Sequence, residues 1–408
     1  MLKFVQLDEL FRSRFFDLAI ICIFGLLVRS VYGLLKFLYT GIQYFLLDDF
    51  SKDFTDPESD LLTKSSHPNG WAPVALSEQL GVGKILKVHV FGQDIALMRD
   101  SSGTVHAVDP YCPHNGAHLG SGEVVKIGGE DCIRCPFHKW SFRAEDGVCI
   151  DVPYTRDRKA PKGSSLKKWH CIEVNHFILV WLHNRAQDPS WFVEHLDDVE
   201  SHGMVYGGKF DYLINCDVYL ITENTADYAH FSTVHGKPSF LDEFCRKLLG
   251  REKNFLVQTF NNFTWEAASK PESHKAVGIY EPCYTIFGFS LMKGQMKSIH
   301  YGPYFLTANL KFWILGLNFE LKLVAGYIPI HSNKHKIVYR MYSDKDLLSR
   351  LFCRLTLMGL FSNIQYDGHI WQNMIRLKRP LYLKEEKTMI NCRRWFLQFD
   401  DSTNNNGN

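Results

Sequence analysis

Two short loops, each with one cysteine and one histidine, constrain this 408-residue chain more than any other feature. Cys112-Pro-His114 forms the first pair, and Cys135-Pro-Phe-His138 forms the second. Most iron–sulfur clusters bind four thiolates, but in one type of [2Fe–2S] cluster two histidines hold one of the irons. The pattern predicts such a cluster, with Cys112 and Cys135 on one iron and His114 and His138 on the other.

A zinc site is the main alternative, because a tetrahedral zinc ion also binds two cysteines and two histidines. In a zinc finger, however, the two cysteines come from one segment and the two histidines from another. Here each loop supplies one of each, which suits a cluster with two chemically different ends. Pro113 and Pro136 stiffen the loops, because each ring fixes φ and removes a backbone N–H. Cys132 makes a Cys-x-x-Cys with Cys135, but residues 131–134 read as a strand, so Cys132 is not expected to be a ligand.

A second group of candidate metal ligands lies in residues 223–235. Asp227 and His230 are three residues apart, so they share one face of a helix. His235 would lie about 140° from His230 around a regular helix, so the chain must bend near residues 232–234 for both to reach one ion. Two imidazoles and one carboxylate are the ligands of non-heme Fe(II) oxygenases, which leave coordination positions open for dioxygen.

The carboxylate of this triad has to come from elsewhere in the chain. Asp367 is the predicted ligand, since Asp344 and Asp346 look like the solvated start of a helix. Asp227 has two interpretations. It is either a helix carboxylate that accepts a hydrogen bond from the ring N–H of His230, or a functional carboxylate beside the iron site.

With both groups of ligands present, the sequence resembles the Rieske non-heme iron oxygenases, and most of all the cholesterol 7-desaturase (Neverland-type) group. The resemblance runs from about residue 69 to about residue 380 and rests on the ligand loops and on residues 69–71, 147–154 and 223–235. Respiratory Rieske proteins carry an extra cysteine in each loop, and a serine and a tyrosine that donate to the cluster. The corresponding positions here hold Ala117, Phe137, Trp140 and Phe142. The loops therefore resemble those of oxygenases, and the cluster is expected to have a lower potential.

The resemblance implies an α+β fold, with an antiparallel β Rieske domain and a helix-grip-like catalytic domain. It implies O2- and NAD(P)H-dependent 7,8-desaturation of cholesterol to 7-dehydrocholesterol, a step toward steroid hormone precursors, by one [2Fe–2S] cluster and one mononuclear Fe(II) per subunit. A separate reductase is expected, because no Gly-x-Gly stretch here completes a dinucleotide fingerprint. The resemblance further implies a homotrimer, in which Asp227 is an electron and proton bridge between one subunit's iron and the next subunit's cluster.

Two other functions stay open at this point. A Rieske monooxygenase could hydroxylate another lipid, steroid or tetrapyrrole with the same residues. A non-enzymatic electron carrier would need only a membrane segment and the cluster, and the second ligand group argues against it. A net charge of +2 gives no nucleic-acid signature.

The N-terminal region predicts a membrane anchor. Residues 18–28 are all apolar, and the apolar character resumes from residue 31 to residue 47. An apolar stretch of about twenty residues can span a bilayer, as a single span or as a hairpin lying partly in the membrane. No small-residue cleavage site follows, which disfavours a signal peptide. The eleven scattered cysteines indicate reduced thiols, so we expect an endoplasmic reticulum protein with its catalytic domains facing the cytosol.

The expected domains are an anchor and linker (1–65), a Rieske domain (66–185), a catalytic domain (186–395) and a disordered tail (396–408). Short antiparallel strands are expected at residues 84–90, 94–98 and 105–108, with a turn at 92–93. The catalytic domain should hold strands in 305–324 and 336–342 and a helix at 346–361. We expect a large antiparallel sheet wrapped around a helix and enclosing an apolar pocket. The 346–361 helix is expected to pack on its domain and not on a membrane.

Overall fold

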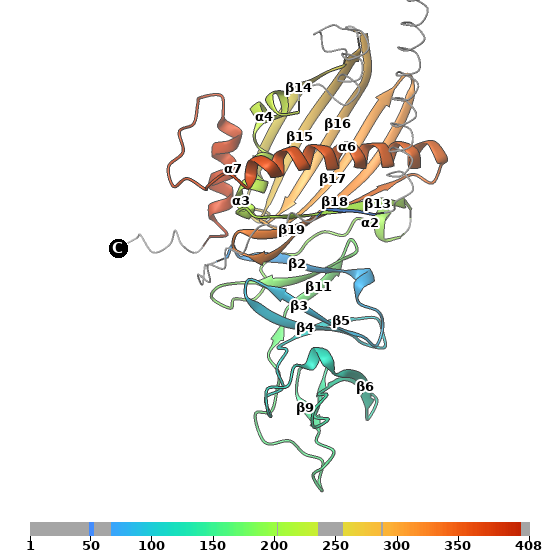
Figure 1. The fold of residues 1–408 in the computed structure, drawn as a ribbon, viewed down its shortest axis with the longest axis vertical. Coiled ribbons are helices and arrows are strands. Elements are labelled where there is room, and N and C mark those ends of the chain that lie inside the picture. Colours follow the sequence, from blue (N-terminus) through green and yellow to red (C-terminus); the bar gives the residue numbers. More distant parts are fainter. Residues whose placement is uncertain (1–48, 53–66, 202, 236–255, 287–288, 401–408) are drawn as a thin grey trace, which may run out of the picture.

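The structure is a computed structural model that describes residues 49–52, 67–201, 203–235, 256–286 and 289–400 (Figure 1). It has two halves, a set of small sheets and one large sheet covered by a long helix. The predicted membrane anchor, residues 1–48, lies outside the described part of the chain.

The first half consists of three antiparallel sheets, with strand orders β10-β5-β4-β3, β11-β12-β2 and β6-β7-β8-β9. Two short 3-10 helices, η1 (Ser77–Gln79) and η2 (Leu119–Ser121), connect them. The strands are β2 (Gly70–Leu76), β3 (Ile85–Val90), β4 (Gln93–Arg99), β5 (Val105–Val108), β6 (Glu123–Ile127), β7 (Glu130–Arg134), β8 (Ser141–Arg143), β9 (Cys149–Asp151), β10 (Lys168–Trp169), β11 (Cys171–Val174) and β12 (Phe177–Leu182).

The predicted hairpin in this half forms, with its turn one residue earlier than expected. Val90 pairs with Gln93, so the turn consists of Phe91 and Gly92. Both turn residues have positive φ, 46° and 75°. That is the backbone of a type I′ turn, whose twist matches that of the strands it connects.

The second half is an eight-stranded sheet of order β1-β13-β19-β18-β17-β16-β15-β14. All neighbours are antiparallel except β1 and β13, which are parallel. The helices are α2 (Asp197–Glu200), α3 (Val218–Asn224), α4 (Tyr228–Thr233), α6 (Leu347–Trp371) and α7 (Lys387–Leu397). The strands are β1 (Asp49–Lys52), β13 (Val205–Ile214), β14 (Leu256–Ala267), β15 (Lys275–Ile286), β16 (Phe289–Tyr301), β17 (Phe305–Ile314), β18 (Leu317–His331) and β19 (Lys334–Ser343).

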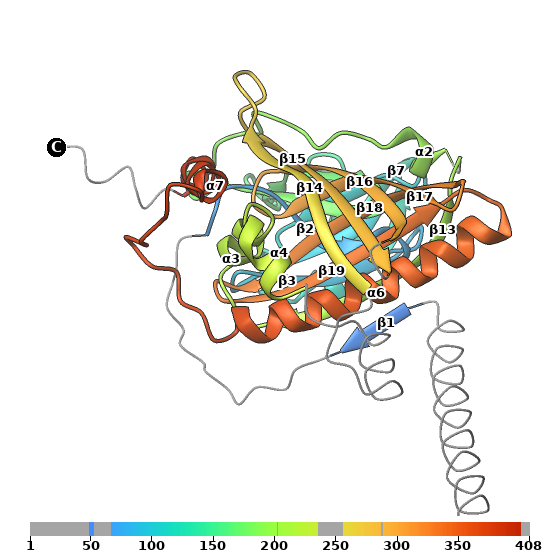
Figure 2. The same cartoon turned by 90° about the horizontal axis from the view of Figure 1, so that it is seen from above.

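Helix α6 lies across one face of this sheet (Figures 1 and 2). It begins after Asp346, whose carboxylate accepts a hydrogen bond from Ser349 N at 2.9 Å, as predicted for a helix start. Two glycines allow the close approach of helix and sheet. A Cβ on Gly207 of β13 would lie 2.3 Å from Cys353 Sγ, and one on Gly368 would lie 2.8 Å from Tyr212 Cε1.

Helix α6 is longer than the sequence predicted. The predicted packing on its own domain is correct for one face of the helix, but not for the other. The helix continues ten residues past the expected end at Phe361 and carries Asp367 on its last turns. Its buried residues contact β13, β18 and β19, whereas several leucines on its other side are exposed. Of the described residues, only α6 forms a helix long and apolar enough to cross a membrane.

Two terminal expectations need correction. Residues 49–52, expected in a linker, form β1 and extend the catalytic sheet at its edge, beside Lys209 to Tyr212 of β13. The disordered tail was expected from residue 396, but α7 continues to Leu397. Phe396 and Phe399 are buried in the core, so that expectation is wrong for residues 396–400. Residues 401–408 lie outside the described part.

Candidate metal centres

The two cysteine–histidine loops have the same backbone design. Cys112 N donates to Ala117 O at 3.0 Å, and Cys135 N donates to Trp140 O at 2.8 Å. In each loop the fourth residue after the cysteine has positive φ, 71° at Gly116 and 63° at Lys139. A lysine in this left-handed region is uncommon, which indicates that the surrounding loop enforces the turn.

The four candidate cluster ligands meet in two pairs between these loops. The rings of His114 and His138 have centroids 4.7 Å apart, and Cys112 and Cys135 are buried next to each other. Trp140 stacks on His114 with an interplanar angle of 3° and donates from Nε1 to Tyr154 Oη at 2.8 Å. The stacking on Trp140 restricts the orientation of the His114 ring.

The donors of this first site fit an iron–sulfur cluster. Burial, together with the adjacent Cys135, raises the pKa of the Cys112 thiol to about 11. Two buried thiolates therefore need a nearby cation, which a bound metal supplies. His138 Nδ1 is buried and has no hydrogen-bond partner among the described residues. Cys132, predicted as a bystander, lies buried in β7 with its thiol directed to Glu130 O at 3.6 Å.

The second predicted group also converges. His230 lies on α4, His235 follows that helix, and Asp367 lies on α6. One ligand atom from each of the three lies within 4.8 Å of the others. His235 Nε2 is 3.2 Å from the Asp367 carboxylate, and the rings of His230 and His235 are 5.2 Å apart.

Helix α4, which carries His230, ends before His235. The two histidines are therefore not held on one continuous helix. Helix α4 has six residues and stops at Thr233, and Val234 N donates to His230 O at 2.7 Å. The α-helix thus ends within the range where a bend is expected, and the ring centroids of His230 and His235 lie 5.2 Å apart. A regular helix through this segment would have kept the two rings apart.

Asp227 occupies a different position from the expected one. It lies at the N-cap of α4, where its Oδ1 accepts hydrogen bonds from Ala229 N at 2.9 Å and His230 N at 3.3 Å. The ring Nδ1 of His230 is 2.7 Å from the backbone oxygen of Asp227. The Asp227 carboxylate oxygen Oδ2 is 3.9 Å from the same nitrogen, which is too far for a hydrogen bond. The predicted bond between the ring and the carboxylate is therefore wrong, and the backbone carbonyl has that role.

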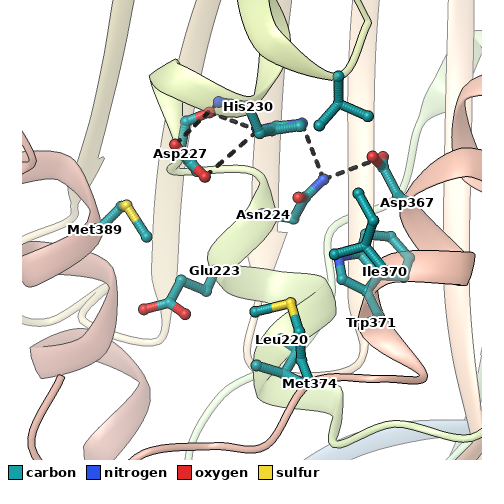
Figure 3. Close-up of a pocket in the computed structure, with 11 residues that line it drawn as sticks. Leu220, Glu223, Asn224, Asp227, His230, Asp367, Ile370, Trp371, Met374 and Met389 are labelled. Carbon is teal, nitrogen blue, oxygen red and sulfur yellow. Dashed lines mark hydrogen bonds and ion pairs between the residues drawn. The ribbon is translucent and has the colours of Figure 1, made fainter.

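Asn224 is a site residue to which sequence reasoning gave no role. Its Nδ2 is 3.1 Å from His230 Nε2 and donates to Asp367 Oδ2 at 3.3 Å. The carboxamide thus connects two members of the triad that lie far apart in the sequence (Figure 3). The bond to Asp367 is of the kind that orients a metal ligand and tunes its basicity.

The donors of this second site also fit a metal ion. Burial lowers the pKa of His230, while the Asp367 carboxylate raises it, and the net pKa lies below its usual value. A neutral imidazole with its Nδ1–H donated to the Asp227 carbonyl leaves Nε2 as the metal-binding atom. His235 Nδ1 is buried without a hydrogen-bond partner among the described residues.

A pocket of about 230 Å³ opens beside this triad (Figure 3). Its lining mixes polar and apolar side chains and comprises Leu220, Glu223, Asn224, Asp227, His230, Val234, Asp367, Ile370, Trp371, Met374 and Met389. Ligand pockets usually measure about 300–1,000 Å³. The cavity is therefore large enough for the edge of a substrate and not for a whole sterol.

Two domain families match this chain. The Rieske [2Fe-2S] domain family matches residues 70–170, and the 3-ketosteroid 9alpha-hydroxylase C-terminal domain family matches residues 180–399. The first range contains both cysteine–histidine loops. The second contains the His230, His235 and Asp367 triad.

Characterised relatives cover most of the chain. A cholesterol 7-desaturase of Drosophila melanogaster is 30% identical over 345 residues, which is 82% of this chain and 76% of the relative. A cholesterol 7-desaturase of Caenorhabditis elegans is 30% identical over 81% of this chain and 76% of its own length. The oxygenase component of a 3-ketosteroid-9-alpha-monooxygenase from Rhodococcus rhodochrous is 25% identical over 81% and 83%.

Solved structures share the fold at low sequence identity. Dicamba monooxygenase bound to dicamba aligns with a TM-score of 0.59 and 16% identity over 81% of this chain and 97% of its own. NdmB of Pseudomonas putida CBB5 aligns with a TM-score of 0.57 and 17% identity over 80% and 89%. The predicted α+β architecture is confirmed, and a Rieske cluster and a mononuclear iron are the cofactors of this fold. The chain belongs to the Rieske non-heme iron oxygenases, in the family of the cholesterol 7-desaturases.

Proposed function

We propose that this chain desaturates cholesterol between carbons 7 and 8 to give 7-dehydrocholesterol. The convergence of His230, His235 and Asp367 beside a pocket carries the proposal, because it supplies an oxygen-activating triad. The relatives named as cholesterol 7-desaturases supply the substrate, since they cover four fifths of this chain. An electron carrier would have no use for this triad.

The proposed reaction balances with the partners that a Rieske oxygenase uses. The substrate loses one hydrogen from each of two neighbouring carbons, and a double bond forms between them. NAD(P)H and a proton supply two further hydrogens through a separate reductase, and dioxygen is reduced to water. When bound, the cluster supplies single electrons and the mononuclear iron supplies the site of dioxygen activation.

We assign the ligands residue by residue. Cys112, His114, Cys135 and His138 would hold the cluster, and His230, His235 and Asp367 would hold the mononuclear iron. The remaining residues of the second site then act on these ligands. The Asp227 carbonyl sets the tautomer of His230, and Asn224 donates to Asp367 and orients its carboxylate.

Replacing a cluster histidine should change the type of cluster. His114→Cys and His138→Cys should each shift the site toward an all-thiolate cluster of lower reduction potential, because thiolates stabilise the oxidised form more than imidazoles do. Electron paramagnetic resonance and redox titration measure this shift. Cys132→Ser is the matched control and should leave the signal unchanged. An unaltered signal in both histidine variants would remove these residues from the ligand set.

Electron delivery from a second subunit is the further part of the proposal. The cluster loops flank the sheet of β6 to β9, at the end of the molecule away from α3 and α4 (Figure 1). A cluster so placed would serve the iron of a neighbouring chain better than its own, in agreement with the trimer that the resemblance implies. Asp227 lines the pocket of the second site, so it is the proposed bridge to that neighbour.

We also propose that residues 1–48 anchor the protein in the endoplasmic reticulum membrane, with the catalytic half in the cytosol. Deleting them should make the protein extractable by alkaline carbonate while it keeps about three irons per chain, since no assigned ligand lies there. Membrane fractionation with iron analysis measures both results. A truncated chain that still resists carbonate would contradict this assignment.

Product analysis tests the proposed function. Full-length protein, a reductase and NAD(P)H should convert cholesterol to 7-dehydrocholesterol, detected by its diene absorbance and by mass spectrometry. The monooxygenase relative favours hydroxylation of a steroid as the second candidate. A hydroxysterol as the sole product would contradict desaturation and identify the reaction as hydroxylation. Turnover of 3-ketosteroids but not of cholesterol would contradict the proposed substrate.

A further inference from the structure

The outward face of α6 is apolar, although the helix covers a sheet. Four leucines in its first half are exposed, three of them strongly, with Leu347 at 75% and Leu348 and Leu355 at 55% each; the fourth is Leu351. The opposite face, including Cys353 and Leu357, is buried against the sheet. Because that inner face is already covered, α6 does not cross a membrane. Its leucines remain available for another apolar surface.

The segment that follows α6 presents more apolar side chains. Residues 374–384 contain five exposed ones, namely Met374, Ile375, Leu377, Leu381 and Leu383. Arg393 Nη2 holds this segment by donating to the carbonyls of Leu377 at 2.6 Å and Lys378 at 2.9 Å. Tyr382 donates to Glu223 at 2.7 Å, while its neighbour Leu381 is 99% exposed. The exposure therefore belongs to a segment with defined contacts to the rest of the fold.

Basic residues accompany these apolar ones. Residues 347–384 contain six basic side chains and one acidic side chain, the buried Asp367, in a chain whose net charge is only +2. The basic residues are Arg350, Arg354, Arg376, Lys378, Arg379 and Lys384. Lys378, Arg379 and Lys384 are exposed in the same segment as Leu381. Apolar groups interleaved with basic ones match the surface of an anionic bilayer.

The N-terminal apolar segment joins the fold near this helix. One residue, Asp48, separates its last apolar residue, Leu47, from the start of β1. Strand β1 pairs with β13, which α6 contacts, and Figure 2 shows β1 beside α6. An anchored chain would therefore bring α6 close to the membrane.

The same surface borders the pocket. Ile370 and Met374 line the cavity beside Asp367 and are also exposed, at 41% and 45%. An apolar molecule leaving a bilayer beneath this surface would meet these two side chains before it reached the triad.

We infer that residues 347–355 and 374–384, the basic–apolar surface, rest on the anionic face of a lipid bilayer and that the pocket takes its sterol directly from that bilayer. The second part rests on the proposed function. The exposed basic side chains of this surface and the nearby end of the N-terminal apolar segment favour the bilayer as the occupant.

Photolabelling of the full-length protein tests the surface. The protein is reconstituted in vesicles of phosphatidylcholine and phosphatidylserine with a photoreactive phosphatidylserine, and adducts are mapped by peptide mass spectrometry. Peptides covering the basic–apolar surface should carry several-fold more adduct than the peptide with Leu315, which is 81% exposed in the turn between β17 and β18. Replacing Lys378, Arg379 and Lys384 by Gln should lower the adduct yield at least about threefold.

A pair of variants tests sterol entry. Leu351→Gln combined with Leu355→Gln should lower turnover of cholesterol held in vesicles several-fold and leave turnover of cholesterol delivered by cyclodextrin unchanged. Leu315→Gln is the matched control and should change neither. Equal loss with both deliveries would overturn entry from the bilayer. Absence of turnover in the wild-type chain under both conditions would contradict the proposed function, and the adduct pattern would still decide the surface.

Two outcomes overturn the membrane assignment itself. One is equal labelling of the Leu315 peptide and the basic–apolar surface. The other is zero-length cross-linking of the surface to a second copy of the chain without lipid adducts, which would identify it as a contact between subunits.

Discussion

His230→Ala should remove the mononuclear iron and leave the [2Fe–2S] cluster in place. The variant loses one of three convergent donors. The lost donor is His230 Nε2, the ring nitrogen that lies 3.1 Å from Asn224 Nδ2 in the unsubstituted chain. Iron content should fall from about three to about two per chain, and product formation should fall to background. Iron analysis, the cluster's absorbance and product assays measure these results.

His369→Ala is the control for this variant. His369 is exposed on α6 two residues after Asp367, so its loss should leave both iron content and turnover unchanged. A His230→Ala protein that keeps the third iron would remove His230 from the ligand set. Loss of the cluster as well would indicate misfolding, which the absorbance of the cluster reveals.

Asp227→Asn should separate iron binding from electron delivery. Asparagine is also a good N-cap, so its side-chain oxygen can still accept from Ala229 N and His230 N, and the backbone carbonyl that orients His230 is unchanged. The variant should keep about three irons and a reducible cluster. Turnover should nevertheless fall at least about tenfold, because the carboxylate proposed to link the iron to the neighbouring cluster is gone.

Asp217→Asn is the matched control for this experiment. Asp217 caps α3 as Asp227 caps α4, by accepting from Tyr219 N at 2.9 Å, but it does not line the pocket. It should retain near-normal turnover. Near-normal turnover in Asp227→Asn would end the bridge hypothesis, and loss of iron would reduce Asp227 to a structural support.

The sequence predicted well whatever depends on local patterns. Residues 105–108 form β5 as expected, because apolar residues alternate with polar ones and turn residues flank them. The strand-like segment 305–324 was less informative. It contains the turn between β17 and β18 at Leu315 and Gly316, and the apolar residues Ile314 and Leu317 on either side conceal this break.

The length of α6 depended on tertiary contacts that no local pattern shows. Residues 362–371 include Asn363 and Gly368, both poor helix formers. Gly368 is favoured there because Tyr212 of β13 occupies the space of a side chain. The helix that carries Asp367 is thus stabilised by its packing on the sheet.

The site shows the same division between local and long-range information. The bend between His230 and His235 followed from helical geometry alone. The capping role of Asp227 had a local signal, since aspartate favours the N-cap, but the spacing to His230 suggested a place within the helix. Asn224 had no such signal, because its partner Asp367 is 143 residues away.

Isotope analysis of a single turnover product tests desaturation most directly. Cholesterol fully deuterated at carbons 7 and 8 is incubated with the full-length protein, a reductase and NAD(P)H under ¹⁸O2, and the sterol product is analysed by mass spectrometry. The account predicts a product that has lost one deuterium from each of the two carbons and carries no ¹⁸O. A product that keeps the deuterium at carbon 8 and carries ¹⁸O at carbon 7 would contradict it.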